Sequence, residues 1–113
     1  MLPREINYLL DVLEAARLLQ TFVAGIDWNS FENDLMRRAA VMRQLEIMGE
    51  AARRLSEETR LEIPEIPWRQ IISMRNRLIH GYDDVDLVIV WETIQNDLPP
   101  LIAQLEKVVP AEE

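Results

Sequence analysis

The sequence lacks cysteine and contains a single histidine among 113 residues. Without cysteine the chain forms no disulfide, thiolate zinc site or thiol nucleophile. One histidine also argues against a transition-metal site built by this chain alone. No apolar run approaches the roughly 18 residues that a membrane span requires, and the first residues lack the apolar core of a signal peptide. These absences predict a cytoplasmic protein without a membrane partner.

The composition is that of a globular chain, with 49% hydrophobic and 28% charged residues. These proportions argue against intrinsic disorder. A length of 113 residues is enough for one hydrophobic core, and we therefore expect residues 1–113 to form a single domain.

The net charge of −8 is unevenly distributed along the chain. Residues 1–36 carry −4, residues 37–77 carry +3 and residues 78–113 carry −7. All nine basic residues of the middle third are arginines, whose planar guanidinium suits phosphate recognition. The simpler interpretation is a solvated helix face with ion pairs one turn apart, such as Glu50 with Arg54.

The first half of the chain has two helical patterns. The first runs from Arg4 to Ala24, followed by Gly25, which suits a helix C-terminus. Asp27 or Ser30 is then a candidate N-cap for the second helix, predicted from Phe31 to Thr59.

Several features of this long second helix predict how it packs. Gly49 interrupts it, which predicts close backbone contact with a neighbouring helix rather than a break. Small residues that would allow such an approach are Ala39, Ala40, Ala51 and Ala52. The predicted apolar stripe comprises Phe31, Leu35, Met42, Leu45, Met48, Ala52 and Leu55. We interpret Met36, Met42 and Met48 as core-filling side chains.

Two further helices follow. Pro67 suits the first turn of a third helix that ends near His80, with Ile71, Leu78 and Ile79 on its apolar face. Gly81 suits the position after its C-terminus.

The fourth helix follows a second potential N-cap, Asp83 or Asp84, and extends from Val85 to Val108. Its interior Pro99-Pro100 predicts a kink or a division into two. With no strand pattern present, the sequence predicts an all-α antiparallel four-helix bundle with a kinked last helix.

The stretch from Arg75 to Tyr82 concentrates the residues most suited to chemistry. Helical spacing places Arg75 on an apolar face, four residues after Ile71 and three before Leu78. A buried guanidinium needs an anionic partner, because an unpaired buried charge is costly. That partner is either a carboxylate such as Glu50 or a phosphate from another molecule.

His80 has two interpretations at the end of this helix. It either stabilises the last helical carbonyls or transfers protons near neutral pH. Tyr82 follows in the turn, where it either packs on the bundle or accepts a modification. From the physical chemistry of these residues alone, a helical interaction module is the favoured function.

The pattern of Arg75, four residues, His80, one residue and Tyr82 resembles the R-x4-H-x-Y motif of HEPN-domain proteins. The chain is most similar to the HepT-like (DUF86) toxins that are paired with minimal nucleotidyltransferase antitoxins. The similarity covers about residues 4–108. Segments that match this family are Leu45–Ala52, Ile66–Ile72, Met74–Asn76, Val85-Asp86, Val90-Trp91 and Leu98-Pro99.

The resemblance implies a metal-independent, cofactor-free endoribonuclease toxin that acts on RNA rather than DNA. It implies a homodimer, or a higher oligomer, in which two motifs meet in one cleft. His80 would be the general acid or base, and Arg75 would hold the phosphate and stabilise its transition-state charge. Asn76 would orient His80.

The resemblance also implies a partner nucleotidyltransferase that uses ATP to attach AMP to Tyr82. The added negative charge beside Arg75 and His80 would block RNA binding. Glu50 either lines the catalytic cleft or pairs with an arginine. The alternative function is a non-catalytic helical subunit that helps a nucleotidyltransferase hold nucleotide or substrate.

Overall fold

The computed structural model describes residues 3–81 and 85–109, and every regular element within those ranges is a helix. The order is η1 (Pro3–Glu5), α1 (Ile6–Val23), α2 (Trp28–Asn33), α3 (Leu35–Arg54), α4 (Glu57–Glu62), α5 (Trp68–His80), α6 (Leu87–Glu92), η3 (Thr93–Asp97) and α7 (Leu98–Val108). The predicted all-α class is confirmed. Within the described residues, no helix has the length and apolar character needed to cross a membrane.

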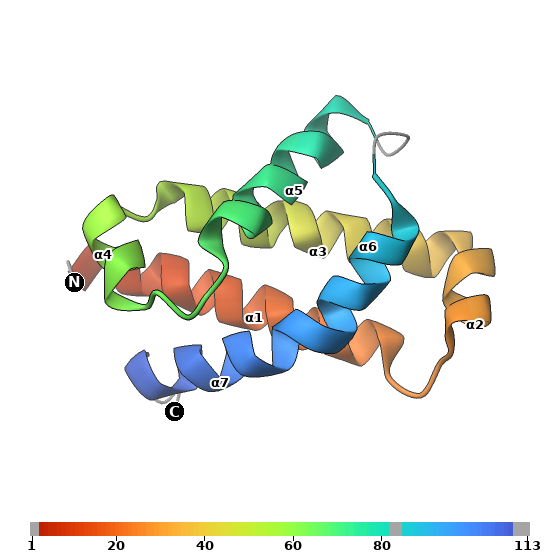
Figure 1. The fold of residues 1–113 in the computed structure, drawn as a ribbon, viewed down its shortest axis with the longest axis horizontal. Coiled ribbons are helices and arrows are strands. Elements are labelled where there is room, and N and C mark those ends of the chain that lie inside the picture. Colours follow the sequence, from red (N-terminus) through yellow and green to blue (C-terminus); the bar gives the residue numbers. More distant parts are fainter. Residues whose placement is uncertain (1–2, 82–84, 110–113) are drawn as a thin grey trace.

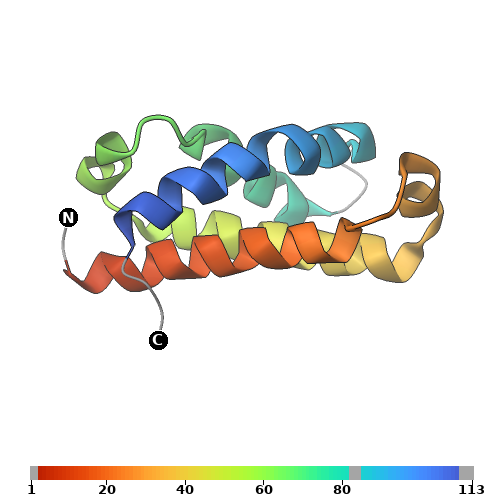
Figure 2. The same ribbon diagram turned by 90° about the horizontal axis from the view of Figure 1, so that it is seen from below.

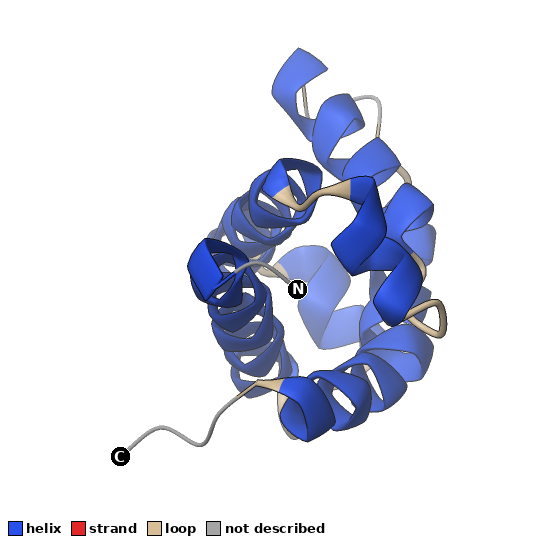
Figure 3. Ribbon diagram, turned by 90° about the vertical axis from the view of Figure 1, so that its left-hand side faces the viewer, coloured by secondary structure: helices blue, strands red, loops and turns tan. Residues whose placement is uncertain are grey.

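The long helices α1 and α3 run antiparallel and form the base of the bundle (Figures 1 and 2). Helix α5 packs obliquely on α3, and α7 packs along α1. The C-terminal end of α5 projects beyond this base in both Figure 1 and Figure 3. The segment that carries His80 therefore stands at an edge of the molecule.

The core lies between these helices. Fully buried side chains include Leu9, Leu19, Leu45, Met48, Leu98 and Leu105. At one end of the bundle, the ring of Phe31 lies 5.3 Å from that of Trp91 and 6.1 Å from that of Trp28. These aromatic contacts attach the short helix α2 to the C-terminal half of the chain.

The prediction of one helix from Phe31 to Thr59 is wrong. The chain instead forms α2, α3 and α4 in that region, because Asp34 and Ser56 begin new helices. Asp34 accepts a hydrogen bond from the backbone N–H of Arg37, and Ser56 accepts one from that of Thr59. Both are N-caps of the usual type. Asp27, one of the two predicted caps, does cap α2.

Leu35 and Met36 were predicted to be buried, but their exposed fractions are 72% and 86%. The first turn of α3 extends past the end of α1, so no long helix covers Leu35 there (Figures 1 and 2). Met36 lies six residues before Met42, which turns it about 120° away from that buried side chain. Met42 and Met48 are buried, as predicted.

The third helix matches its prediction, with Pro67 at the N-cap and Gly81 following at a φ of 138°. Ile79 is an exception, because it is 55% exposed on the projecting end of α5. The proposed caps Asp83 and Asp84 lie outside the described residues. Asp86 is the N-cap of α6, where it accepts from the Val88 N–H.

The last helical segment changes geometry where the sequence predicts a kink. Pro99 and Pro100 lack the N–H groups that an α-helix would direct to the carbonyls four residues earlier. The preceding residues form the π-helical segment η3, in which the Leu98 N–H reaches the carbonyl of Thr93, five residues back. The prolines therefore occupy the first turn of α7, and the wider turn precedes them.

Candidate active site

The contact between α3 and α5 is closest at Gly49, next to the motif arginine. A side chain at Gly49 would overlap the Cβ of Arg75 and stand 3.0 Å from the backbone oxygen of Ile71. Only glycine allows the two backbones to approach this closely. The predicted close packing at Gly49 is confirmed, and it holds the base of the Arg75 side chain against α3.

The guanidinium of Arg75 is largely enclosed, with 18% of its side chain exposed. Its Nη2 donates to Oε2 of Glu50 over 3.0 Å, and its Nη1 donates to Oδ1 of Asn76 over 2.9 Å. Of the two anionic partners that the sequence left open, the structure contains the carboxylate. The arginine is thus held in one orientation by two acceptors.

Glu50 is surrounded by arginines. Its carboxylate also accepts from Arg53 over 2.6 Å and lies 3.7 Å from the Arg54 Nε. The hydrogen bond from Arg53 lowers the pKa of Glu50, the positive charges of Arg75 and Arg54 act in the same direction, and burial opposes them. Glu50 therefore stays ionised at neutral pH, and it retains cationic partners when Arg75 is withdrawn.

A pocket of about 260 Å³ opens at this ion pair, between α1, α3 and α5. We call it the Arg75 pocket. Its lining residues are Tyr8, Asp11, Arg43, Glu46, Ile47, Glu50, Ala51, Arg54, Arg75 and Ile79. Basic and acidic groups are mixed in this lining, so an anion that enters competes with Glu50 for the arginines.

His80 is exposed and is the last residue of α5. Five residues at 100° each place it about 140° around the helix from Arg75. It is accordingly not among the described residues that line the Arg75 pocket. One copy of the chain therefore does not direct both motif side chains into the same pocket.

Of the two remaining predicted site residues, Asn76 and Tyr82, the structure describes only Asn76. Asn76 is exposed and bonded to Arg75, and its orientation of His80 stays a prediction. Tyr82 lies outside the described residues.

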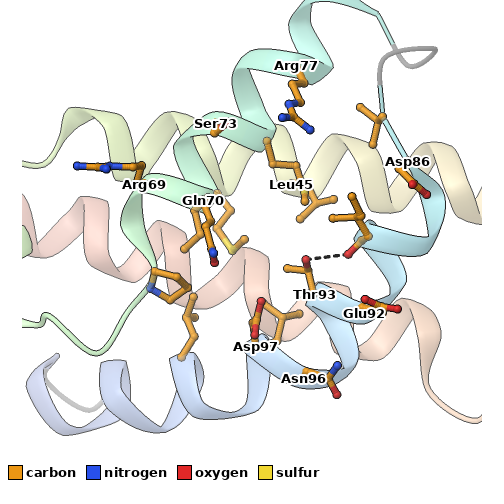
Figure 4. A pocket seen from close by; sticks show the side chains of 18 residues that line it. Leu45, Arg69, Gln70, Ser73, Arg77, Asp86, Glu92, Thr93, Asn96 and Asp97 are labelled. Atoms are coloured by element: carbon orange, nitrogen blue, oxygen red, sulfur yellow. Dashed lines mark hydrogen bonds between the residues drawn. The ribbon is translucent and has the colours of Figure 1, made fainter.

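A larger cleft was missed at the sequence level. It has a volume of about 540 Å³ and lies on the opposite side of α5, against α6, η3 and the start of α7 (Figure 4). We call it the α5–η3 cleft. Its apolar floor includes Leu45, Met48, Met74, Leu98 and Leu101, and its polar lining includes Arg69, Gln70, Ser73, Arg77, Asp86, Glu92, Thr93, Asn96 and Asp97. Exposed polar residues at helical spacing on α5 were the only sequence signal for it.

Comparison with known proteins agrees with these features. The family model described as "Ribonuclease HepT-like" matches residues 12–108. "Probable ribonuclease HepT" of Thermococcus cleftensis is 40% identical over 101 residues, covering 89% of this chain and 92% of that protein. "Putative RNase MJ1380" of Methanocaldococcus jannaschii is 39% identical over 99 residues, covering 88% and 91% respectively.

A third relative, "Putative RNase TTE0752" of Caldanaerobacter subterraneus subsp. tengcongensis, is 37% identical over 106 residues, or 94% of this chain and 95% of that protein. No solved structure matches the chain. The family match includes Glu50, Arg75 and His80, and the three relatives are aligned over 88–94% of this chain. The chain is a member of the HepT-like ribonuclease family.

Proposed function

We propose that this protein is a metal-independent endoribonuclease. The observation that carries the proposal is the fixed, enclosed guanidinium of Arg75 together with an exposed His80 on one helix of a chain in the HepT-like ribonuclease family. Arginine holds phosphate well because its fork matches the phosphate oxygens. Histidine exchanges protons near neutral pH.

The reaction is attack of a ribose 2′-hydroxyl on the adjacent phosphorus. The 2′ oxygen loses its proton to a general base, the new P–O2′ bond forms, and the bond to the 5′ oxygen breaks as a general acid protonates that leaving group. His80 supplies proton transfer. Arg75 stabilises the charge that accumulates on the phosphoryl oxygens.

The active site is a composite of two copies in this proposal. Arg75 and His80 diverge on one helix, so a second copy brings the histidine of one motif to the arginine of the other. The projecting end of α5 carries the exposed apolar Ile79, and α6 adds Val88 and Ile89, each 46% exposed. These side chains supply apolar surface for a homodimer. Light scattering is expected to show a dimer that Ile79→Asp dissociates.

The biological role proposed is that of a toxin, neutralised by a nucleotidyltransferase that transfers AMP from ATP to Tyr82. Incubation with ATP and the cognate nucleotidyltransferase is expected to add mass in units of AMP to the wild-type chain. Tyr82→Phe should remain unmodified. Adducts that still form on Tyr82→Phe would place the modification elsewhere.

The decisive experiment is RNA cleavage in EDTA by the purified chain, free of partner. Wild type is expected to cleave single-stranded RNA and His80→Ala to lose this activity. Arg17→Ala is the matched control, because Arg17 pairs with Glu106 between α1 and α7, away from the motif. Cleavage that survives His80→Ala, or an inactive unmodified wild type, would refute the proposal.

One observation favours a second candidate. Glu50 already occupies the guanidinium that RNA would need, which is compatible with a structural role for Arg75. The chain would then be a non-catalytic subunit that helps a nucleotidyltransferase hold nucleotide or substrate. Nucleotide transfer by the partner that depends on this chain, in the absence of any RNA cleavage, would support that function.

A further inference from the structure

The α5–η3 cleft has a division of charge that the proposed catalytic residues do not use. Figure 4 shows Gln70 and Arg77 pointing into the cleft from α5, and Thr93 and Asp97 facing them from η3. Arg69 and Arg77 thus lie on one wall, and the carboxylates of Asp86, Glu92 and Asp97 lie on the other. The floor between them is apolar.

Arg77 is available to a ligand. None of the ion pairs in the described part of the chain involves it, in contrast to Arg75. It lies three residues before His80, about 4.5 Å along the helix axis and on the same side of α5. An anion bound at Arg77 would therefore lie next to the phosphate at which His80 transfers protons.

The opposite wall rejects anions but accepts hydrogen-bond donors. Asp97 is half-buried and belongs to the π-helical turn, with Thr93 one turn earlier on the same wall. The Thr93 hydroxyl donates to the carbonyl of Ile89 over 2.8 Å, so its hydrogen is not available to a ligand. The wall presents mainly acceptors, including the carboxylates of Asp86, Glu92 and Asp97. Gln70, opposite, carries both a donor and an acceptor.

The cleft also suits a flat ring. Its volume of about 540 Å³ falls within the usual range for small-molecule sites. Its floor of leucine and methionine side chains provides the apolar and sulfur contacts that aromatic rings favour. A nucleobase has this shape. Adenine and cytosine present an exocyclic amino donor to a carboxylate, whereas the N3–H of uracil lies between two carbonyl oxygens that a carboxylate repels.

We infer that the α5–η3 cleft binds one nucleotide of the RNA strand, its phosphate at Arg77 and its base at Asp97 and Gln70, with preference for adenine or cytosine over uracil. The inference rests on the proposed function, since it assigns base preference to the same enzyme. It makes Arg77, Gln70 and Asp97 substrate-binding residues. In this orientation the phosphate lies at Arg77, near the C-terminal end of α5, and the base lies between Gln70 at the start of α5 and Asp97 of η3.

The test measures binding rather than cleavage, with His80→Ala protein and fluorescent single-stranded RNA of eight adenosines, eight cytidines or eight uridines. The adenosine and cytidine strands are expected to bind about ten-fold more tightly than the uridine strand. Asp97→Asn should remove this preference, because an amide also donates to the carbonyls of uracil. Arg77→Ala should weaken all three and reduce the salt slope by about 0.7.

Two matched controls carry the same changes of charge at distant, exposed positions. Glu14→Gln on α1 should retain the base preference, and Arg17→Ala should retain the salt slope. Equal binding of the three strands, no binding at all, or an equal loss of preference in Glu14→Gln would overturn the inference. An unchanged salt slope in Arg77→Ala would do the same.

The two proposals fail separately. Base-dependent binding by His80→Ala together with an inactive wild type would refute the nuclease and leave the nucleotide site standing. RNA cleavage by wild type without any base-dependent binding would refute the site alone.

Discussion

Replacement of Gly49 by alanine tests the closest contact of the fold and the anchoring of the motif arginine together. The new Cβ would overlap that of Arg75, and it would stand 2.9 Å from the Cγ of Arg75 and 3.0 Å from the Ile71 backbone oxygen. Carbon contacts are ordinarily about 3.5–4.0 Å. Neither a Cβ nor a backbone oxygen escapes by changing rotamer, so α3 and α5 must separate.

The expected change in the free energy of unfolding follows from two opposing effects. Forcing extra volume into a tight contact costs about 1–3 kcal/mol, and a backbone clash belongs at the upper end of that range. Alanine recovers about 1 kcal/mol through its higher helix propensity. We expect Gly49→Ala to lower the free energy of unfolding by about 2 kcal/mol, which corresponds to a Tm decrease of about 8 °C.

Urea unfolding followed by circular dichroism measures this change. Ala39→Gly is the matched control, because Ala39 is exposed on the same helix and reports the propensity difference of about 1 kcal/mol without a packing change. Adding Arg75→Ala should not rescue Gly49→Ala, since alanine retains the overlapping Cβ. A Gly49→Ala variant that is as stable as wild type, or more stable, would refute the close approach of α3 and α5.

Three further predictions concern other parts of the chain. Hydrogen bonds from Ser56 lower the pKa of the buried Glu5 below its ordinary value of 4.5. The ionised carboxylate therefore stabilises the fold at pH values above 4.5, and this stabilisation is lost as the pH falls through the lower pKa of the folded state. Tm measured against pH should therefore fall less steeply in acid for Glu5→Gln, and parallel curves would contradict this. Met48 is buried and Met36 is exposed. Met48→Ala should therefore lower the free energy of unfolding by about 2–5 kcal/mol, whereas Met36→Ala should change it by less than about 0.5 kcal/mol. Equal urea midpoints for the two variants would contradict this difference in burial. Glu50→Gln in the His80→Ala background should steepen the salt slope of RNA binding by about 0.7, and an unchanged slope would show that Arg75 does not reach phosphate.

The helix ends that could be predicted are those with a strong local signal. Gly25 and Gly81, both at positive φ, and Pro67 mark ends that the structure contains. The breaks at Asp34 and Ser56 had equally local signals, since both are good N-caps. They were missed because apolar spacing continued across them, and periodicity alone does not distinguish one helix from two in series.

The candidate site was predictable only where it depends on helical spacing. The enclosure of Arg75 and its pairing with Glu50 follow from an arginine on an apolar face and an acid on the neighbouring helix. The α5–η3 cleft depends on how α5 crosses the bundle and on the wide turn before Pro99. Neither the crossing angle nor the π-helical turn has a pattern in the sequence, so this cleft required the folded structure.

The two sides of α5 carry different groups, and the proposed shared RNA site rests on this difference. Arg75 turns toward α3, where Gly49 and Glu50 hold it, and Arg77 turns about 200° away into the α5–η3 cleft. His80 lies near Arg77 in angle and projects at the free end of the helix. Because the fixed guanidinium and the exposed imidazole face different ways, we propose that a phosphate held by Arg75 is reached by the histidine of a second copy. In that proposed dimer, the same divergence would leave Arg77 to position the adjoining nucleotide, and a single helix would contribute to both halves of the composite site.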